Sequence, residues 1–197
     1  MMKHARISIV AAMLAMVPFG ANALTVSGTS AFDGGYATTI TYDDGIVRSS
    51  ANGRDNPYNA LGAADGNFFE IGRNSSVDLT FGTLFDTSVT VFEITFGNVA
   101  SYAESVLLSV GYQGTFTDIG SITNLFAQGG GTVALSSALG LFDTVRLTDT
   151  STQGGGFDID AVLVSPVTPV PLPAGLVLLG GGLAALGVFG RRKRAEA

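Results

Sequence analysis

Two apolar runs near the ends of this chain limit the part of it that can fold as an ordinary globular domain. Residues 7–19 and 176–190 carry almost no polar side chains, and the second run stops at a cluster of four cations. Runs of this kind are typical of segments that enter a membrane. The stretch between them, residues 24–166, has the size of one domain and is the part that we expect to fold in water.

The N-terminus has the three parts of a secretory signal peptide. Three basic side chains lie within the first six positions, the apolar run follows, and Ala21 and Ala23 form a small-x-small cleavage site. We therefore expect residues 1–23 to be a helical signal peptide that signal peptidase removes after Ala23.

The C-terminal tail joins a rigid spacer to an apolar helix and a basic end. Pro171 and Pro173, within residues 167–175, each fix φ and lack a backbone N–H, which favours an extended linker. Residues 176–190 predict a transmembrane helix that is slightly short for a typical bilayer. Basic flanks stay in the cytoplasm, so residues 191–197 are expected inside and the main body outside. The stop-transfer cluster is Arg191, Arg192, Lys193 and Arg194.

This three-part order resembles the PEP-CTERM class of bacterial sorting signals, in its VPLPA variant. The resemblance implies an inner-membrane intermediate whose tail is cut near Pro173 by a membrane protease of the exosortase family. It also implies delivery of the ectodomain to the cell surface or the extracellular matrix. The matching motif is Val170, Pro171, Leu172, Pro173 and Ala174.

The composition of residues 24–166 excludes several function classes. Fifteen Asp and Glu stand against four Arg and no Lys, a formal charge of −11. Such a charge repels phosphate backbones, so we expect no nucleic-acid partner, whereas it suits divalent cations held by oxygen. The chain has no Cys, and its only His is His4, inside the expected signal peptide. Disulfides, Ser-His-Asp and Cys-His nucleophiles, and His-based zinc sites are therefore excluded from the mature domain.

Short strands separated by glycine and asparagine dominate this ectodomain. Residues 77–81 and 105–112 alternate apolar and polar side chains, which is typical of half-buried strands. No long amphipathic helical pattern is present. We predict an all-β fold, an antiparallel jelly-roll-like β-sandwich, flanked by the signal-peptide helix and the transmembrane helix. Further strands are expected at 88–96, 115–119, 132–135, 143–148 and 157–164, with a leading hairpin within 24–57.

Two segments carry a more specific resemblance. The early run 59–68, which reads NALGAADGNF, and the late run 156–162, which reads GFDIDAV, resemble the galactose-binding-like jelly rolls. That group includes discoidin-type domains and many carbohydrate-binding modules. The resemblance implies that the early loop lies beside the first core strands and that the late strand closes the sandwich.

Four oxygen-bearing residues, Asp65, Asn67, Asp158 and Asp160, are candidate ligands of a structural Ca²⁺ ion. Asp158 and Asp160 lie two apart in an expected strand, so their side chains should emerge on one face. Calcium needs six to eight oxygens, and the tight loop at Asp65 supplies several of them close together. The alternative is ordinary turn chemistry at Asp65, with Asp158 or Asp160 paired to Arg146 or capping loop N–H groups.

A sugar-binding surface needs an exposed aromatic ring with polar groups around it. Tyr58 lies beside Arg54 and Asn56 in a loop-like stretch, and these three residues are candidate glycan contacts. The chain has no Trp, so the competing interpretation is that Tyr58 is one of several scattered surface tyrosines.

The sequence thus predicts an exported protein of the cell envelope or extracellular matrix that is not an enzyme. Its β-sandwich is expected to be structural, adhesive or glycan-binding, with envelope polysaccharide as the expected partner. The alternative is a secreted glycan hydrolase that uses two carboxylates. Glu70, Glu93 and Glu104 fall in or beside strand-like runs without a recognisable catalytic context.

Overall fold

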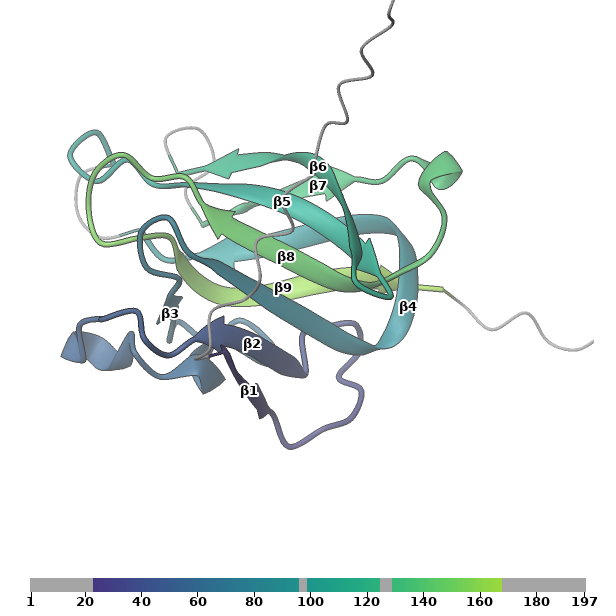
Figure 1. The fold of residues 1–197 in the computed structure, drawn as a ribbon, viewed down its shortest axis with the longest axis horizontal. Helices are drawn as coiled ribbons and strands as arrows, with labels where there is room; N and C mark the ends of the chain where they lie inside the picture. Colours follow the sequence, from purple (N-terminus) through teal and green to yellow (C-terminus); the bar gives the residue numbers. More distant parts are fainter. Residues whose placement is uncertain (1–22, 96–98, 125–128, 168–197) are drawn as a thin grey trace, which may run out of the picture. The chain divides into compact units, whose positions relative to one another are not determined.

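The structure of the protein is a computed structural model that describes residues 23–95, 99–124 and 129–167. In these ranges no helix is long and apolar enough to cross a membrane, and the expected transmembrane segment lies outside them. The chain divides into two units after Pro166, and all the elements below lie in the first (Figure 1). The strands are β1 (Ala23–Ser27), β2 (Thr39–Asp43), β3 (Phe69–Glu70), β4 (Ser76–Glu93), β5 (Ser105–Tyr112), β6 (Thr115–Thr123), β7 (Gly131–Ala134), β8 (Phe142–Asp149) and β9 (Asp158–Pro166). Three 3-10 turns complete the set, η1 (Ala51–Gly53), η2 (Pro57–Ala60) and η3 (Ser137–Leu139).

The strands form two antiparallel layers that share one long strand. The larger layer has the order β1-β2-β4-β8-β5-β6, and the smaller has the order β3-β9-β4-β7. Residues 76–80 of β4 pair with β8 in the larger layer, and residues 88–91 pair with β7 in the smaller one. Figure 1 shows β4 curving from one layer into the other at the edge of the molecule.

A glycine sits in the corner where β4 changes layer. Gly82 has φ +65°, a conformation that costs a side-chain-bearing residue about 1–2 kcal/mol. An added Cβ would also overlap the carbonyl oxygen of Ala31. The register of the β4–β8 pairing shifts between Thr80 and Phe85, on either side of this glycine. Glycine is therefore required here by both the backbone conformation and the close approach of another segment.

The inward-facing side chains of both layers meet in one core. Val77 and Leu79 from the first half of β4 are fully buried, as are Val89 and Val91 from its second half, and all four belong to the same cluster. Burial of each such side chain contributes about 1.5–3 kcal/mol. The largest fully buried side chains include four phenylalanines, Phe69, Phe81, Phe85 and Phe157.

The structure confirms the predicted antiparallel β-sandwich and the leading hairpin, which is formed by β1 and β2. It corrects one detail of the strand prediction. Residues 77–81 and 88–96 were expected to form separate strands, but β4 runs unbroken from Ser76 to Glu93. Gly82 lies between the two expected strands, in the corner where β4 bends, and the strand continues through it. The two-residue strand β3 was not predicted, because two residues show no period.

Candidate functional site

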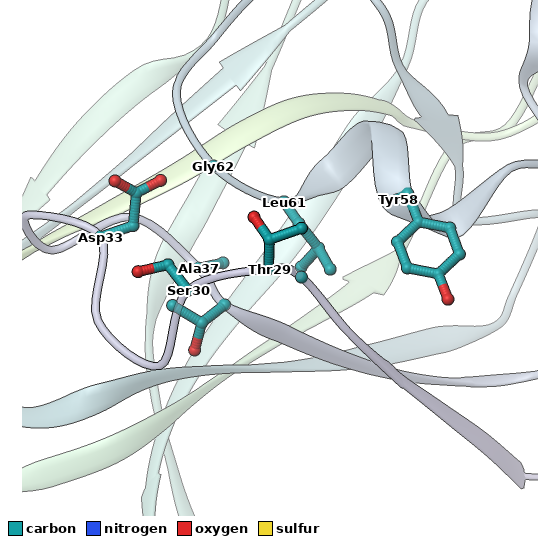
Figure 2. A pocket seen from close by; sticks show the side chains of 9 residues that line it. Thr29, Ser30, Asp33, Ala37, Tyr58, Leu61 and Gly62 are labelled. Carbon is teal, nitrogen blue, oxygen red and sulfur yellow. The ribbon is translucent and has the colours of Figure 1, made fainter.

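A pocket of about 220 Å³ opens beside η2. Three segments line it: the loop that follows β1, residues 37–38 directly before β2, and η2 with the turn that follows it. Figure 2 shows Tyr58 and Asp33 toward opposite ends of the pocket, with Thr29 and Ser30 between them. A second pocket of about 400 Å³ shares the 28–30 segment as a wall. The pocket is therefore a depression lined by both polar and apolar residues, with one aromatic side chain among them.

Backbone hydrogen bonds hold the three segments together. Gly28 N–H donates to the carbonyl oxygen of Thr38 at 2.7 Å, and Gly62 N–H donates to that of Ala37 at 2.9 Å. Pro57 occupies the first position of η2, where its missing N–H costs nothing. The backbone that forms the pocket walls is therefore held in place before a ligand binds. This lowers the entropy cost of ordering these segments on binding.

Tyr58 is the exposed aromatic residue of this site, with 54% of its surface accessible. Its backbone N–H donates to the side-chain oxygen of Asn56, which caps η2 at 3.2 Å. Asn59 fixes the same turn by donating from Nδ2 to the carbonyl oxygens of Gly53 and Phe68. The ring is therefore presented to solvent from a braced turn.

Of the three predicted glycan contacts, the structure places only Tyr58 on the pocket wall. Arg54 forms an ion pair with Glu70 at 3.1 Å, and its guanidinium lies 5.4 Å from the ring centroid of Phe68. The Asn56 side chain accepts from Tyr58 N–H and donates to Asn59 Oδ1 at 3.1 Å. Both residues stabilise the surrounding loops. The polar wall of the pocket comes instead from the loop after β1, a segment that sequence reasoning did not connect with Tyr58.

The predicted calcium ligands fall into two separate groups. Asp160 accepts hydrogen bonds from the backbone N–H groups of Asp65 at 2.9 Å and Gly66 at 3.2 Å. Asp65 in turn accepts from Asn67 N–H at 2.9 Å. Asp158 lies opposite Glu70 in the β3–β9 pairing.

Asp160 and Asp158 are separated because β9 contains a bulge. Phe92 pairs with Ala161 while Glu93 pairs with Ile159, so Asp160 has no partner across the sheet. Ile159 and Val162 are three apart, yet both belong to the core, so the alternation slips by one residue at the bulge. The expectation that the two aspartates share one face rested on an uninterrupted period of two.

The arrangement does not fit a calcium cage built from the four predicted residues. Across the described ranges, no group of three or more Asp, Glu, His or Cys side chains could hold a metal ion. Loop capping, the alternative offered by the sequence, accounts for Asp160 and Asp65. The other alternative, pairing with Arg146, is not what the structure shows, because Arg146 forms a bidentate ion pair with Asp78 at 2.7 and 2.8 Å. A role for Ca²⁺ stays a prediction.

Two buried carboxyl groups, those of Glu104 and Asp158, form a feature that the sequence did not reveal. Their residues are 7% and 3% exposed, and Glu104 Oε2 and Asp158 Oδ1 accept no hydrogen bond within the described residues. Burial raises the pKa of Glu104 to about 8, and the neighbouring charge of Asp158 adds to the rise. Burial likewise raises the pKa of Asp158 to about 8, against the opposing effect of Arg54. Both groups therefore favour the neutral form near pH 7.

A glycine-rich loop lies beside Glu104, because a Cβ at Gly154 would lie 3.6 Å from Glu104 Oε1. Its backbone is held by Asp149, which accepts from Phe157 N–H at 3.0 Å and from the Ser151 hydroxyl at 2.6 Å. A Cβ at Gly155 would lie 2.9 Å from Glu70 Oε2, so a larger residue there would meet the carboxylate. The only sequence signal for this packing is the glycine triplet at 154–156.

Comparisons with known proteins do not identify a family. No family model matches the chain, and no curated protein matches it. Among solved structures, the chain is similar to the CBM32 of AlyQ in complex with 4,5-unsaturated mannuronic acid, at 18% identity and a TM-score of 0.43, over 63% of this chain and 96% of that one. It is also similar to the GH31 CBM32-2 bound to GalNAc, at 12% identity and a TM-score of 0.36, over 74% of this chain and 98% of that one. The lectin domain of lectinolysin complexed with Lewis B antigen matches at 13% identity and a TM-score of 0.36, over 76% of this chain and 94% of that one. Likeness at this level carries no argument about the ligand.

Proposed function

We propose that residues 24–166 are an exported, non-catalytic glycan-binding domain. The observation that carries the proposal is the pocket whose lining combines exposed Tyr58 with the hydroxyl residues Thr29 and Ser30 and the carboxylate residue Asp33. An aromatic ring gives the apolar face of a sugar a stacking surface, and hydroxyl and carboxylate groups hydrogen-bond its edge. The volume of the pocket, about 220 Å³, is below the roughly 300–1,000 Å³ of sites that enclose drug-sized ligands. A pocket of this size suits contact with a single sugar ring or with the end of a glycan chain.

The residues of the pocket favour binding over hydrolysis. A glycosidase needs two carboxyl groups about 5–9.5 Å apart on either side of the scissile bond. The pocket wall has one carboxylate, that of Asp33. The raised-pKa pair, Glu104 and Asp158, is buried and lines none of the pockets described above. The hydrolase alternative therefore has no accessible carboxylate pair at this site.

The proposed route to the cell surface uses both ends of the chain. Cleavage after Ala23 would remove only the first residue of β1. The proposed sorting tail begins at residue 167, directly after β9 ends at Pro166. Both cuts would therefore leave the sandwich essentially whole. Ala21, the motif 170–174, the helix 176–190 and the cluster 191–194 lie outside the described residues, so this part of the proposal rests on the sequence.

Glycan binding is tested with the purified protein and a panel of neutral, amino and acidic oligosaccharides. We expect binding that Tyr58→Ala weakens at least tenfold, because the stacking surface is lost. Tyr112→Ala is the matched control, since Tyr112 is also an exposed tyrosine, 43% accessible, at the turn between β5 and β6. Equal affinities of both variants and the parent would contradict the proposed site.

Export is tested by intact-mass analysis of the protein recovered from the surface of its host. We expect a chain that starts at Leu24 and ends near Pro173. Recovery of surface protein that retains residues 191–194 would contradict tail removal.

A further inference from the structure

The pocket beside Tyr58 carries a single charge. Asp33 is the only charged residue among those that line it, and none of them is basic. Its carboxylate accepts no hydrogen bond within the described part of the chain, while its backbone carbonyl accepts from Tyr36 N–H at 2.8 Å. A Cβ at Gly62 would lie 3.4 Å from Asp33 Oδ2, so the Asp33 side chain packs beside the backbone of Gly62. The carboxylate is thus available to a ligand.

The arginines of the domain are engaged away from this pocket. Arg48 donates to the carbonyl oxygens of Asp43, Ile46, Glu70 and Ile71, at 2.6 to 3.2 Å. Arg54 pairs with Glu70 and Arg146 with Asp78. Arg73 donates to the carbonyl oxygen of Thr152 at 3.4 Å. An acidic sugar in the pocket would meet Asp33 and no cation.

Because the pocket lining has one carboxylate and no cation, we infer that the pocket selects sugars bearing a free, protonated amine and rejects uronic acids. The inference rests on the proposed function, since it assumes that a sugar ring lies against Tyr58. An ammonium group donates up to three hydrogen bonds, and a carboxylate acceptor strengthens them by charge. A uronate would instead be repelled by Asp33 within a domain of formal charge −11. A partly or fully deacetylated hexosamine polymer is the class of ligand that fits.

The test compares three tetrasaccharides on the full-length chain purified in mild detergent: glucosamine, N-acetylglucosamine and mannuronate. Titrations run at about pH 6, where a sugar amine is protonated. We expect the glucosamine tetramer to bind about two- to fivefold more tightly than its acetylated counterpart, the range of an exposed ion pair. That advantage should shrink at high salt, and the uronate tetramer should bind most weakly.

Asp33→Asn should abolish the preference for the amine while leaving the acetylated tetramer bound. Asp55→Asn is the matched control, because it removes the same charge from another exposed site and should keep the preference. Equal binding of both hexosamine tetramers to the parent, tighter binding of the uronate, or an unchanged preference in Asp33→Asn each overturns the inference and leaves glycan binding standing. If no tetrasaccharide binds, and Tyr58→Ala changes nothing across the wider panel, the proposed function fails with it.

Discussion

Asp160 holds the loop at Asp65 through two hydrogen bonds from backbone N–H groups, although 95 residues separate the two aspartates. The contact joins the last strand of the sandwich to the loop that follows η2. Because Asp160 sits at the bulge in β9, its side chain meets this loop while Asp158 lies opposite Glu70. Two hydrogen bonds between protein groups therefore tie the loop to the sheet.

Asp160→Asn should lower the free energy of unfolding by about 1–3 kcal/mol. The new side-chain NH₂ group would face the backbone N–H of Asp65 or Gly66, and two donors cannot form a hydrogen bond. Urea denaturation of the purified protein measures the change. The loss should be the same in excess Ca²⁺ and in chelator, since the hydrogen bonds that Asp160 accepts run between protein groups. If Ca²⁺ stabilises the parent protein and Asp160→Asn removes that effect, the calcium interpretation is right and loop capping is insufficient.

Stability should fall as pH rises from about 5 to about 8. The pKa values of Glu104 and Asp158 are raised from 4.5 and 3.8 to about 8 in the folded state. Between the unfolded and the folded pKa, the folded protein holds protons that the unfolded chain has lost, so raising the pH favours unfolding. Both groups add to this slope, and they titrate as a coupled pair because each charge disfavours the other. The charges around the pair are those of Glu70 on β3, Glu93 on β4, Asp149 on β8 and Arg54.

Thermal melts across this pH range check the prediction. Asp158→Asn and Glu104→Gln should each flatten the profile, because an amide has no proton to lose. Asp55→Asn changes an exposed carboxylate and should leave the slope as it is. A parent protein whose melting temperature rises between pH 5 and pH 8 would show that these two carboxyls are ionised in the fold.

Gly82→Ala should destabilise the protein by more than about 2 kcal/mol, because the new Cβ meets the carbonyl oxygen of Ala31 in addition to the unfavourable φ. Gly114→Ala separates the two effects, since Gly114 also has a positive φ, +81°, but a Cβ added there would have nothing within 4 Å. Only the conformational cost of about 1 kcal/mol is expected there. Equal losses in denaturant midpoint would mean that the β4 corner tolerates a methyl group.

Arg54→Ala and Tyr58→Ala should have opposite consequences. Loss of Arg54 leaves the carboxylate of Glu70, a residue only 6% exposed, without its ion pair, so we expect a loss of about 1–3 kcal/mol in stability. Glycan affinity per folded molecule should not change. Tyr58→Ala should weaken binding and leave the melting temperature nearly constant, because its ring is exposed. If folded Arg54→Ala protein binds glycan more weakly than the parent, Arg54 contributes to the glycan site as the sequence predicted.

The sequence determined those features of the protein that depend on local pattern. Alternation of side chains in 105–112 and 77–81 identified strands whose inward residues are fully buried, such as Val106 and Leu79. The absence of Cys and of His beyond His4 excluded whole classes of chemistry. These inferences work because a strand repeats every two residues and because side-chain chemistry is a property of the residue alone.

Only the tertiary structure decided which distant residues meet. It brought Asp33 and Tyr58 to one pocket and placed Asp65 against Asp160. It also buried Glu104 and Asp158, with no hydrogen-bond partner among the described residues for one oxygen of each. It paired Arg54 with Glu70, outside the pocket that Tyr58 lines. Two local irregularities help to set such pairings. The positive φ of Gly82 bends β4, and the bulge at Asp160 shifts the register of β9 by one residue. In β9 the sequence keeps a period of two through Asp160, whereas the core-facing side of the strand slips by one residue there.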